Sequence, residues 1–212
     1  MKALLLIDIQ NDFLPTGTLP VPQGDQVIPI ANLLMPRFDL IVATQDWHPA
    51  NHGSFAANHD GKKPGEMITL GGLPQILWPT HCVQNTPGAD FAPGLDRQRI
   101  THVTRKGTDP AIDSYSGFFD NGQRRATGLH EYLQGQKVTD LTILGLATDY
   151  CVKFTALDAR QLGYAVHLIP EGCRGVNLKP GDADAAIREM QTAGVQILPA
   201  DQVAAPMPGA PG

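Results

Sequence analysis

Short apolar runs separated by helix-like segments are the feature that most narrows what this chain can fold into. Six such runs, mostly rich in β-branched residues or leucine, span residues 3–7, 40–44, 100–104, 141–145, 165–169 and 195–198. Runs of this length that are apolar on both faces are typical of a parallel sheet covered on both sides. Their alternation with helices indicates βαβ units with right-handed crossovers. The sequence therefore predicts an α/β fold: a single three-layer domain with a mostly parallel six-stranded sheet and helices on both faces.

Capping residues and changes in composition mark the remaining organisation. Helices are expected over residues 25–35, 148–162 and 182–193, each with a polar residue at its start, the last two followed by a glycine. Residues 48–94 are rich in Gly, Pro, Asn and His, which predicts long, ordered functional loops. We expect one domain over residues 1–200 and a disordered tail of Pro, Ala and Gly over 201–212.

The composition argues against several classes of protein. With 42% hydrophobic and 17% charged residues the chain is globular, and its formal net charge of −5 gives no support to nucleic-acid binding. No apolar run approaches the ~20 residues of a membrane-spanning helix, and the short run after Lys2 predicts no signal peptide. The three widely spaced cysteines argue against a disulfide framework and favour a reducing, cytoplasmic compartment.

Reactive side chains follow four of the predicted strands. Asp8 follows the first strand, Asp46 and His48 the second, Lys106 the third, and Cys151 lies at the helix start after the fourth. Open parallel sheets bind ligands outside the carboxyl ends of their strands. These side chains are therefore predicted to meet at one edge of the sheet, which is a candidate active site.

Cys151 has two interpretations. A free cysteine is commonly a small buried side chain, and alone this one is most simply part of the core. Its place near a helix N-terminus, however, favours a thiolate and supplies N–H groups for an oxyanion. Asp8 could then act as the base for the thiol, with Lys106 balancing the charges of the pair. The convergence of strand ends favours the nucleophile.

The segment TQDWHPANHGSF carries a metal-site pattern. Asp46 and His48 are two residues apart, so an extended backbone places both side chains on one face. His52, His59 and His81 lie within the same short region. One carboxylate with two or three imidazoles suits Zn²⁺, Fe²⁺ or Mn²⁺. From the spacing alone, a polar loop with satisfied hydrogen bonds explains the pattern equally well.

Aromatic side chains occur near these positions. Phe13 follows Asp8 by five residues, Trp78 precedes His81 by three, and Tyr115 follows Lys106. Aromatic residues beside a polar rim suit a planar ligand.

The segments LLLIDIQNDF, TQDWHPANHGSF, WPTHCVQNTPGA, KGTDPAIDSYSGFFDN and LGLATDYCVKFTALDA together resemble the nicotinamidases, a family of isochorismatase-like cysteine hydrolases. The likeness covers nearly the whole chain, from about residue 4 to 194. It implies hydrolysis of nicotinamide to nicotinate and ammonia in NAD salvage, through a cysteine thioester, with pyrazinamide as a side substrate.

The resemblance also implies a role for individual residues. The catalytic triad falls on Asp8, Lys106 and Cys151, and the oxyanion hole on the backbone N–H groups of Ala147 and Cys151, with a cis peptide between Leu146 and Ala147. The metal ligands fall on Asp46, His48 and His81, binding one Zn²⁺ or Fe²⁺, with Mn²⁺ as a further option. His52 matches a histidine that coordinates directly in only some members. The aromatic residues that line the substrate site fall on Phe13, Trp78 and Tyr115.

Alternatives remain open at this point. Another cysteine hydrolase of the superfamily, acting on a different small amide or carbamoyl compound, would share the triad. Its members that cleave isochorismate do not use a cysteine, and other amide-cleaving members generally lack the D-x-H pair, so Cys151 and Asp46 argue against both. The expected partner is a small-molecule substrate, with neither nucleic acid nor membrane, and the sequence leaves a homo-oligomer open.

Overall fold

The computed structural model describes residues 1–204 of the chain and contains the expected central sheet. Six strands lie in the order β5-β2-β1-β6-β7-β8, and every neighbouring pair is parallel. These strands are β1 (Lys2–Ile7), β2 (Leu40–Asp46), β5 (His102–Lys106), β6 (Asp140–Leu146), β7 (Ala165–Arg174) and β8 (Gln196–Ile197). The predicted six-stranded α/β fold is therefore confirmed.

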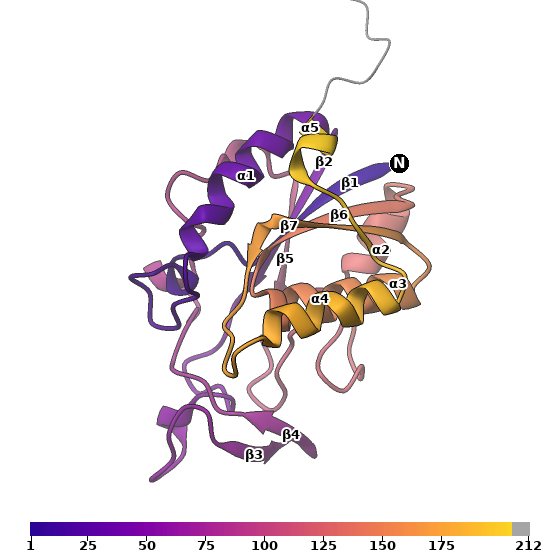
Figure 1. Ribbon diagram of the computed structural model, residues 1–212. Helices are drawn as coiled ribbons and strands as arrows, with labels where there is room; N and C mark the ends of the chain where they lie inside the picture. The colour runs from indigo at the N-terminus through magenta and orange to yellow at the C-terminus, as the bar shows by residue number, and fades with distance from the viewer. Residues whose placement is uncertain (205–212) are drawn as a thin grey trace, which may run out of the picture.

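Helices cover both faces of this sheet. In Figure 1 the helices α1 and α5 lie on one side of the strands, and α2, α3 and α4 lie on the other. Their bounds are α1 (Val27–Leu34), α2 (Leu129–Gly135), α3 (Lys153–Gln161), α4 (Asp182–Thr192) and α5 (Ala200–Ala204). Short 3-10 turns occupy Asn11–Phe13, Gly24–Gln26, Met35–Arg37, Ala56–Asn58, Pro87–Ala89 and Arg97–Arg99, and a π-turn occupies Thr148–Val152.

The innermost strands form the core because both of their faces are covered. Every residue of β2 and all but the first of β1 are buried, which explains why β1 after Lys2 and residues 40–43 of β2 are continuously apolar rather than alternating. At the end of β6 the backbone passes so close to β1 that a Cβ on Gly145 would lie 2.1 Å from the carbonyl oxygen of Ile7. Gly145 also has a φ of +133°, so glycine is required there on both grounds.

Some elements differ from the expectation. The segment predicted as loops contains an antiparallel hairpin, β3 (Met67–Leu70) and β4 (Leu73–Ile76), which projects from the lower edge of the domain in Figure 1. Helix α2 was not predicted, since its seven residues are too short to show a period. Helix α5 covers the first four residues of the segment expected to be a disordered tail, and 205–212 lie outside the described residues.

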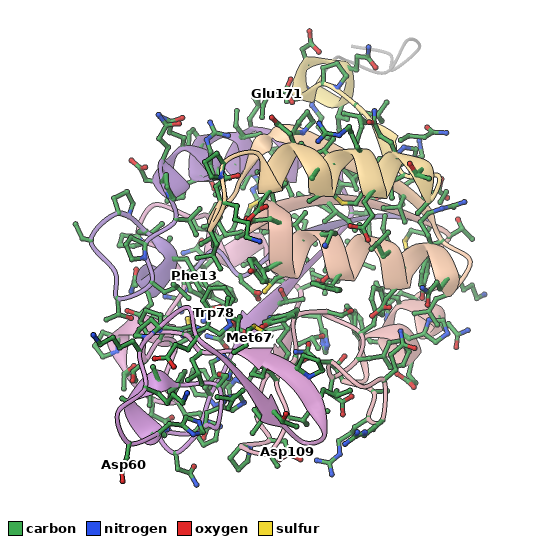
Figure 2. All side chains as sticks on the ribbon, turned by 60° about the horizontal axis from the view of Figure 1, so that its bottom comes forward. Phe13, Asp60, Met67, Trp78, Asp109 and Glu171 are labelled. Carbon is green, nitrogen blue, oxygen red and sulfur yellow. The ribbon has the colours of Figure 1, made fainter. Side chains whose placement is uncertain are left out.

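The carboxyl ends of the strands face the hairpin. This edge comes forward in Figure 2, where the labelled Phe13, Trp78 and Met67 all lie on it. No helix within residues 1–204 is long and apolar enough to cross a membrane.

Candidate active site

Lys106 lies at the centre of the predicted rim. It ends strand β5, its side chain is fully buried, and its Nζ lies 2.9 Å from Asp8 Oδ2 and 2.5 Å from Asp46 Oδ1. The same Nζ donates a hydrogen bond to Cys151 Sγ at 3.3 Å and another to the carbonyl oxygen of Ser114 at 3.0 Å. One ammonium therefore joins the ends of β1 and β2 to the turn that follows β6, as the positions in the sequence predict.

The charges of this cluster depend on Lys106. Burial would lower the pKa of Lys106, but the carboxylates of Asp46 and Asp8 outweigh it and hold that pKa well above its usual value. Burial would likewise raise the pKa of Asp46, but the Lys106 ammonium and His48 bring it well below the usual range. Lys106 is therefore charged and Asp46 ionised at neutral pH.

Asp8 is suited to carry a proton. Burial raises the pKa of its carboxyl above the ordinary value of 3.8, and Lys106 and a hydrogen bond from Thr44 oppose that rise. The Thr44 hydroxyl donates to Asp8 Oδ1 at 2.6 Å and accepts the N–H of Asp8 at 3.2 Å, so both sides of the residue are fixed. A carboxylate oxygen of Asp8 lies within 4.8 Å of Cys151 Sγ. Asp8 therefore lies where a base for the thiol is needed.

Cys151 lies in the π-turn Thr148–Val152 that precedes α3. Burial raises the pKa of its thiol well above the ordinary value, and Lys106 opposes that rise. The helix start was expected to favour the thiolate, but burial is the larger effect, so the resting sulfur keeps its proton and requires a base. The peptide bond between Leu146 and Ala147 is cis, as the resemblance implied.

Asp46, His48 and His81 form a group that can hold a metal ion. Their ligand atoms all lie within 4.8 Å of one another, with Asp46 Oδ2 at 3.6 Å from His48 Nε2 and 3.9 Å from His81 Nε2. The Nδ1 atom of each histidine donates to a backbone carbonyl oxygen, His48 to Gly107 at 2.8 Å and His81 to Pro79 at 2.7 Å. With Nδ1 bonded in this way, Nε2 is the ring nitrogen that faces Asp46 in both histidines, which is how metal-binding histidines are held. The donor set therefore fits a divalent cation.

His52 lies beside this group in a different setting. His52 Nδ1 lies 2.7 Å from the Ser54 hydroxyl oxygen and 3.2 Å from the Ser54 backbone nitrogen, and its buried Nε2 has no hydrogen-bond partner among the described residues. Burial, together with the neighbouring His48, lowers the pKa of His52 to about 4, so the ring is neutral. Its ligand atom groups with His48 and Asp113 rather than with Asp46.

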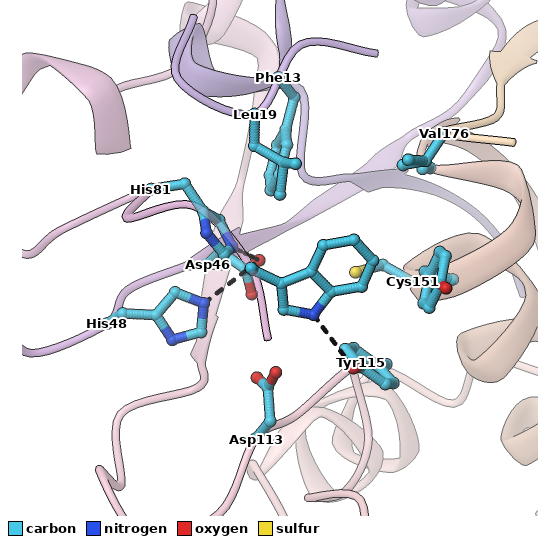
Figure 3. A pocket seen from close by; sticks show the side chains of 12 residues that line it. Phe13, Leu19, Asp46, His48, His81, Asp113, Tyr115, Cys151 and Val176 are labelled. Carbon is cyan, nitrogen blue, oxygen red and sulfur yellow. Dashed lines mark hydrogen bonds and ion pairs between the residues drawn. The ribbon is translucent and has the colours of Figure 1, made fainter. Parts of the chain in front are cut away.

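A cavity of about 30 Å³ opens between the metal group and Cys151. Figure 3 shows Phe13 above this space, with His48 and His81 on the side opposite Cys151. The Trp78 Nε1 donates to the Tyr115 hydroxyl at 3.1 Å, and Gln75 donates to the same oxygen at 3.0 Å. Phe13, Trp78 and Tyr115 all line the cavity, as predicted. The space suits a planar ligand that reaches from the metal group to the sulfur.

Four residues that line the cavity were not singled out from the sequence: Leu19, Asp113, Tyr150 and Val176. Tyr150 precedes Cys151 and Asp113 lies two residues before Tyr115, so their neighbours offered a signal. Leu19 and Val176 are aliphatic residues in loops, and only the folded chain brings them to the cavity. His59 instead bonds through Nε2 to the carbonyl oxygen of Gly53, away from the site.

Comparisons with known proteins agree with this geometry. Residues 2–202 match the model of the isochorismatase domain family. The nicotinamidase of Escherichia coli K12 is 52% identical over 200 residues, which cover 92% of this chain and 93% of that protein. The structure is similar to that of an Acinetobacter baumanii nicotinamidase and pyrazinamidase, with a TM-score of 0.92, 42% identity and coverage of 95% and 97%. It is also similar to the zinc complex of a Pyrococcus horikoshii pyrazinamidase, with a TM-score of 0.76, 40% identity and coverage of 93% and 98%.

Proposed function

Because the chain belongs to the isochorismatase family, we propose that it converts nicotinamide to nicotinate and ammonia through a thioester on Cys151. Relatives with 45–52% identity over most of the chain are nicotinamidases, which supports this activity. One observation carries the proposal: the buried Lys106 ammonium contacts Asp8, Asp46 and Cys151 at once. The nucleophile, its base and the metal group are thereby held in one unit beside the cavity.

The chain's own residues supply the acylation step. Asp8 takes the proton from the Cys151 thiol, and the sulfur attacks the carbonyl carbon of the amide. The backbone N–H groups of Ala147 and Cys151 are proposed to hold the resulting oxyanion. Asp8 then returns the proton to the leaving nitrogen, and ammonia departs as the thioester forms.

Hydrolysis of the thioester uses the same base. Asp8 takes a proton from a water molecule, whose oxygen attacks the thioester carbon, and the sulfur leaves and recovers its proton. Lys106 stays charged throughout, since the carboxylates raise its pKa so far. It keeps Asp8 and the sulfur in place while negative charge moves between them.

A divalent ion, which we propose to be Zn²⁺ or Fe²⁺, would be held by Asp46, His48 and His81 with positions left for other ligands. When bound, it supplies a Lewis acid that accepts the nitrogen of a pyridine ring and so orients the substrate. We propose that His52 lies beside the ion as a neutral ring, because its pKa is lowered to about 4 and its ligand atom groups with His48 and Asp113 rather than with Asp46.

The ring would lie between Phe13 and Trp78, with the carboxamide toward Cys151. Pyrazinamide has the same shape and a ring nitrogen in the same position, and a relative from Mycobacterium tuberculosis, 34% identical, is a nicotinamidase and pyrazinamidase. We therefore propose pyrazinamide as a second substrate. The reaction returns nicotinamide to a form that NAD salvage uses.

The proposal is tested by ammonia release from nicotinamide. The purified protein, supplied with Zn²⁺ or Fe²⁺, should release ammonia, and Cys151→Ala should not. Cys173→Ala is the matched control, because Cys173 is buried and free but lies on β7 and not in the cavity. Absence of release by the wild type with either metal would contradict the proposed function.

A further inference from the structure

The carboxylate of Asp149 has a defined task that the proposed mechanism does not use. Asp149 belongs to the π-turn that carries Cys151, and its side chain is buried. Its Oδ1 accepts the backbone N–H of Val176 at 2.9 Å, and its Oδ2 accepts the backbone N–H of Asn177 at 2.7 Å. Both oxygens of a buried carboxylate thus bind two successive amides of one loop, and hydrogen bonds to an ionised acceptor are the stronger kind.

The loop held in this way is the connection between β7 and α4, residues 175–181. Asn177 has a φ of +51° and accepts the N–H of Ala183 through its side chain at 2.9 Å, so the loop is also tied to the start of α4. A Cβ on Gly175 would lie 2.6 Å from the Cβ of Ala183, so the backbone packs closely there. The position of Val176 therefore depends on a few contacts, of which the Asp149 carboxylate makes two.

Val176 forms one wall of the substrate cavity. Figure 3 shows it on the Cys151 side, across the cavity from His48 and His81. A flat ring bound between the metal group and the sulfur would be confined on this side by Val176. The carboxylate of Asp149, which belongs to the same turn as Cys151, therefore also fixes the position of Val176.

We propose that Asp149 is a positioning residue for substrate: by fixing the loop that carries Val176, it sets the width of the slot that holds a flat heteroaromatic amide. The inference rests on the proposed function, since the slot is the nicotinamide site. It extends that function, because Asp149 would favour a flat ring without touching the substrate itself. Asp149 acts on the binding of the ring and not on the chemistry of Cys151.

Steady-state kinetics with Asp149→Asn tests this assignment. Asparagine keeps the shape but offers one acceptor oxygen and turns its NH₂ group toward the other amide, so one hydrogen bond is lost. KM for nicotinamide should rise by ~10-fold or more, while kcat changes by less than ~3-fold, which is the pattern of lost binding that is equal in the ground state and the transition state. Asp158→Asn is the matched control: Asp158 is a buried carboxyl on α3 that accepts from Gln123, away from the cavity, and its KM should stay at the wild-type value.

Two further measurements separate the wall from the turn. Hydrogen exchange at the amides of Val176 and Asn177 should accelerate in Asp149→Asn. Val176→Ala should also raise KM but leave hydrogen exchange at Asn177 unchanged, because the Asp149 carboxylate binds backbone N–H groups and not the Val176 side chain. Since both changes act on one wall, KM in the double variant should rise by less than the product of the two single increases.

Failure of the Asp149 inference and failure of the proposed function give different results. If the wild type is active and Asp149→Asn exchanges faster at both amides but keeps its KM, the inference is wrong and the contact only ties a loop. A fall in kcat with KM unchanged also overturns it, because Asp149 would then act on the Cys151 turn. Failure of the proposed function would instead appear in the wild type, as no ammonia release from nicotinamide.

Discussion

Replacing Lys106 by methionine should strongly destabilise the protein as well as inactivate it. The Lys106 side chain is fully buried between two carboxylates, of which Asp8 is also fully buried and Asp46 is 6% exposed. Methionine fills a similar volume but leaves two buried carboxylates without their cation. Breaking a buried ion pair from one side costs about 3–5 kcal/mol. For a domain of about 200 residues, each kcal/mol lowers Tm by about 2–4 °C, so Tm should fall by about 6–20 °C.

The loss should depend on pH in a defined direction. Lys106 holds down the pKa of Asp8, which burial already raises above 3.8, so removing the lysine raises that pKa further. A carboxyl with a raised pKa in the folded state favours the protonated form. Its contribution to stability is therefore intact below pH 3.8 and is lost as the pH rises through the folded pKa. The Tm deficit of Lys106→Met should be smaller at about pH 5 than at about pH 8.

Differential scanning fluorimetry of wild type, Lys106→Met and the double variant with Asp8→Asn provides the assay. The double variant removes Asp8, one of the two buried carboxylates that have lost their cation. It should therefore recover part of the lost Tm while remaining inactive. Measurements should be made with metal and after chelation, because a bound cation would compensate Asp46. An unchanged Tm in Lys106→Met at both pH values would refute the reasoning that Lys106 is the cation that neutralises this cluster.

Two further predictions concern the metal group and the base. Chelation should lower Tm and raise KM for nicotinamide, and both should recover on adding Zn²⁺ or Fe²⁺. Elemental analysis should find that His81→Ala loses the metal and that His52→Ala keeps it. Loss of the metal in His52→Ala would show that His52 is a direct ligand. Thr44→Val removes the hydrogen bond that lowers the pKa of Asp8, so the acidic limb of the pH profile of kcat/KM should move to higher pH by up to about one unit. Thr142 is a buried threonine on β6, and Thr142→Val should leave the acidic limb in place. An unmoved limb in Thr44→Val would mean that this limb does not report Asp8.

Much of the candidate site follows from the sequence because it is built at strand ends. The apolar runs locate the strands, and a parallel sheet brings their carboxyl ends together, so Asp8, Lys106 and Cys151 could be placed at one rim without coordinates. The D-x-H pair is also local, since an extended segment places Asp46 and His48 on one face.

What the sequence did not reveal depends on packing between distant segments. Val176 and Leu19 are ordinary aliphatic residues whose role comes only from the loops around them. The high pKa of the Cys151 thiol is set by burial, whereas the sequence showed only a helix start nearby. Short elements such as the β3–β4 hairpin and α2 have too few residues to show a period.

The central claim is that Cys151 carries the acyl group during turnover. Wild-type protein supplied with metal, mixed with excess nicotinamide and quenched with acid within one turnover, should contain a fraction with one added nicotinoyl group by intact mass. Peptide mapping should place that group on Cys151 and not on Cys82 or Cys173. Steady ammonia release with no nicotinoyl adduct on Cys151 at any quench time, together with an active Cys151→Ala variant, would contradict the account.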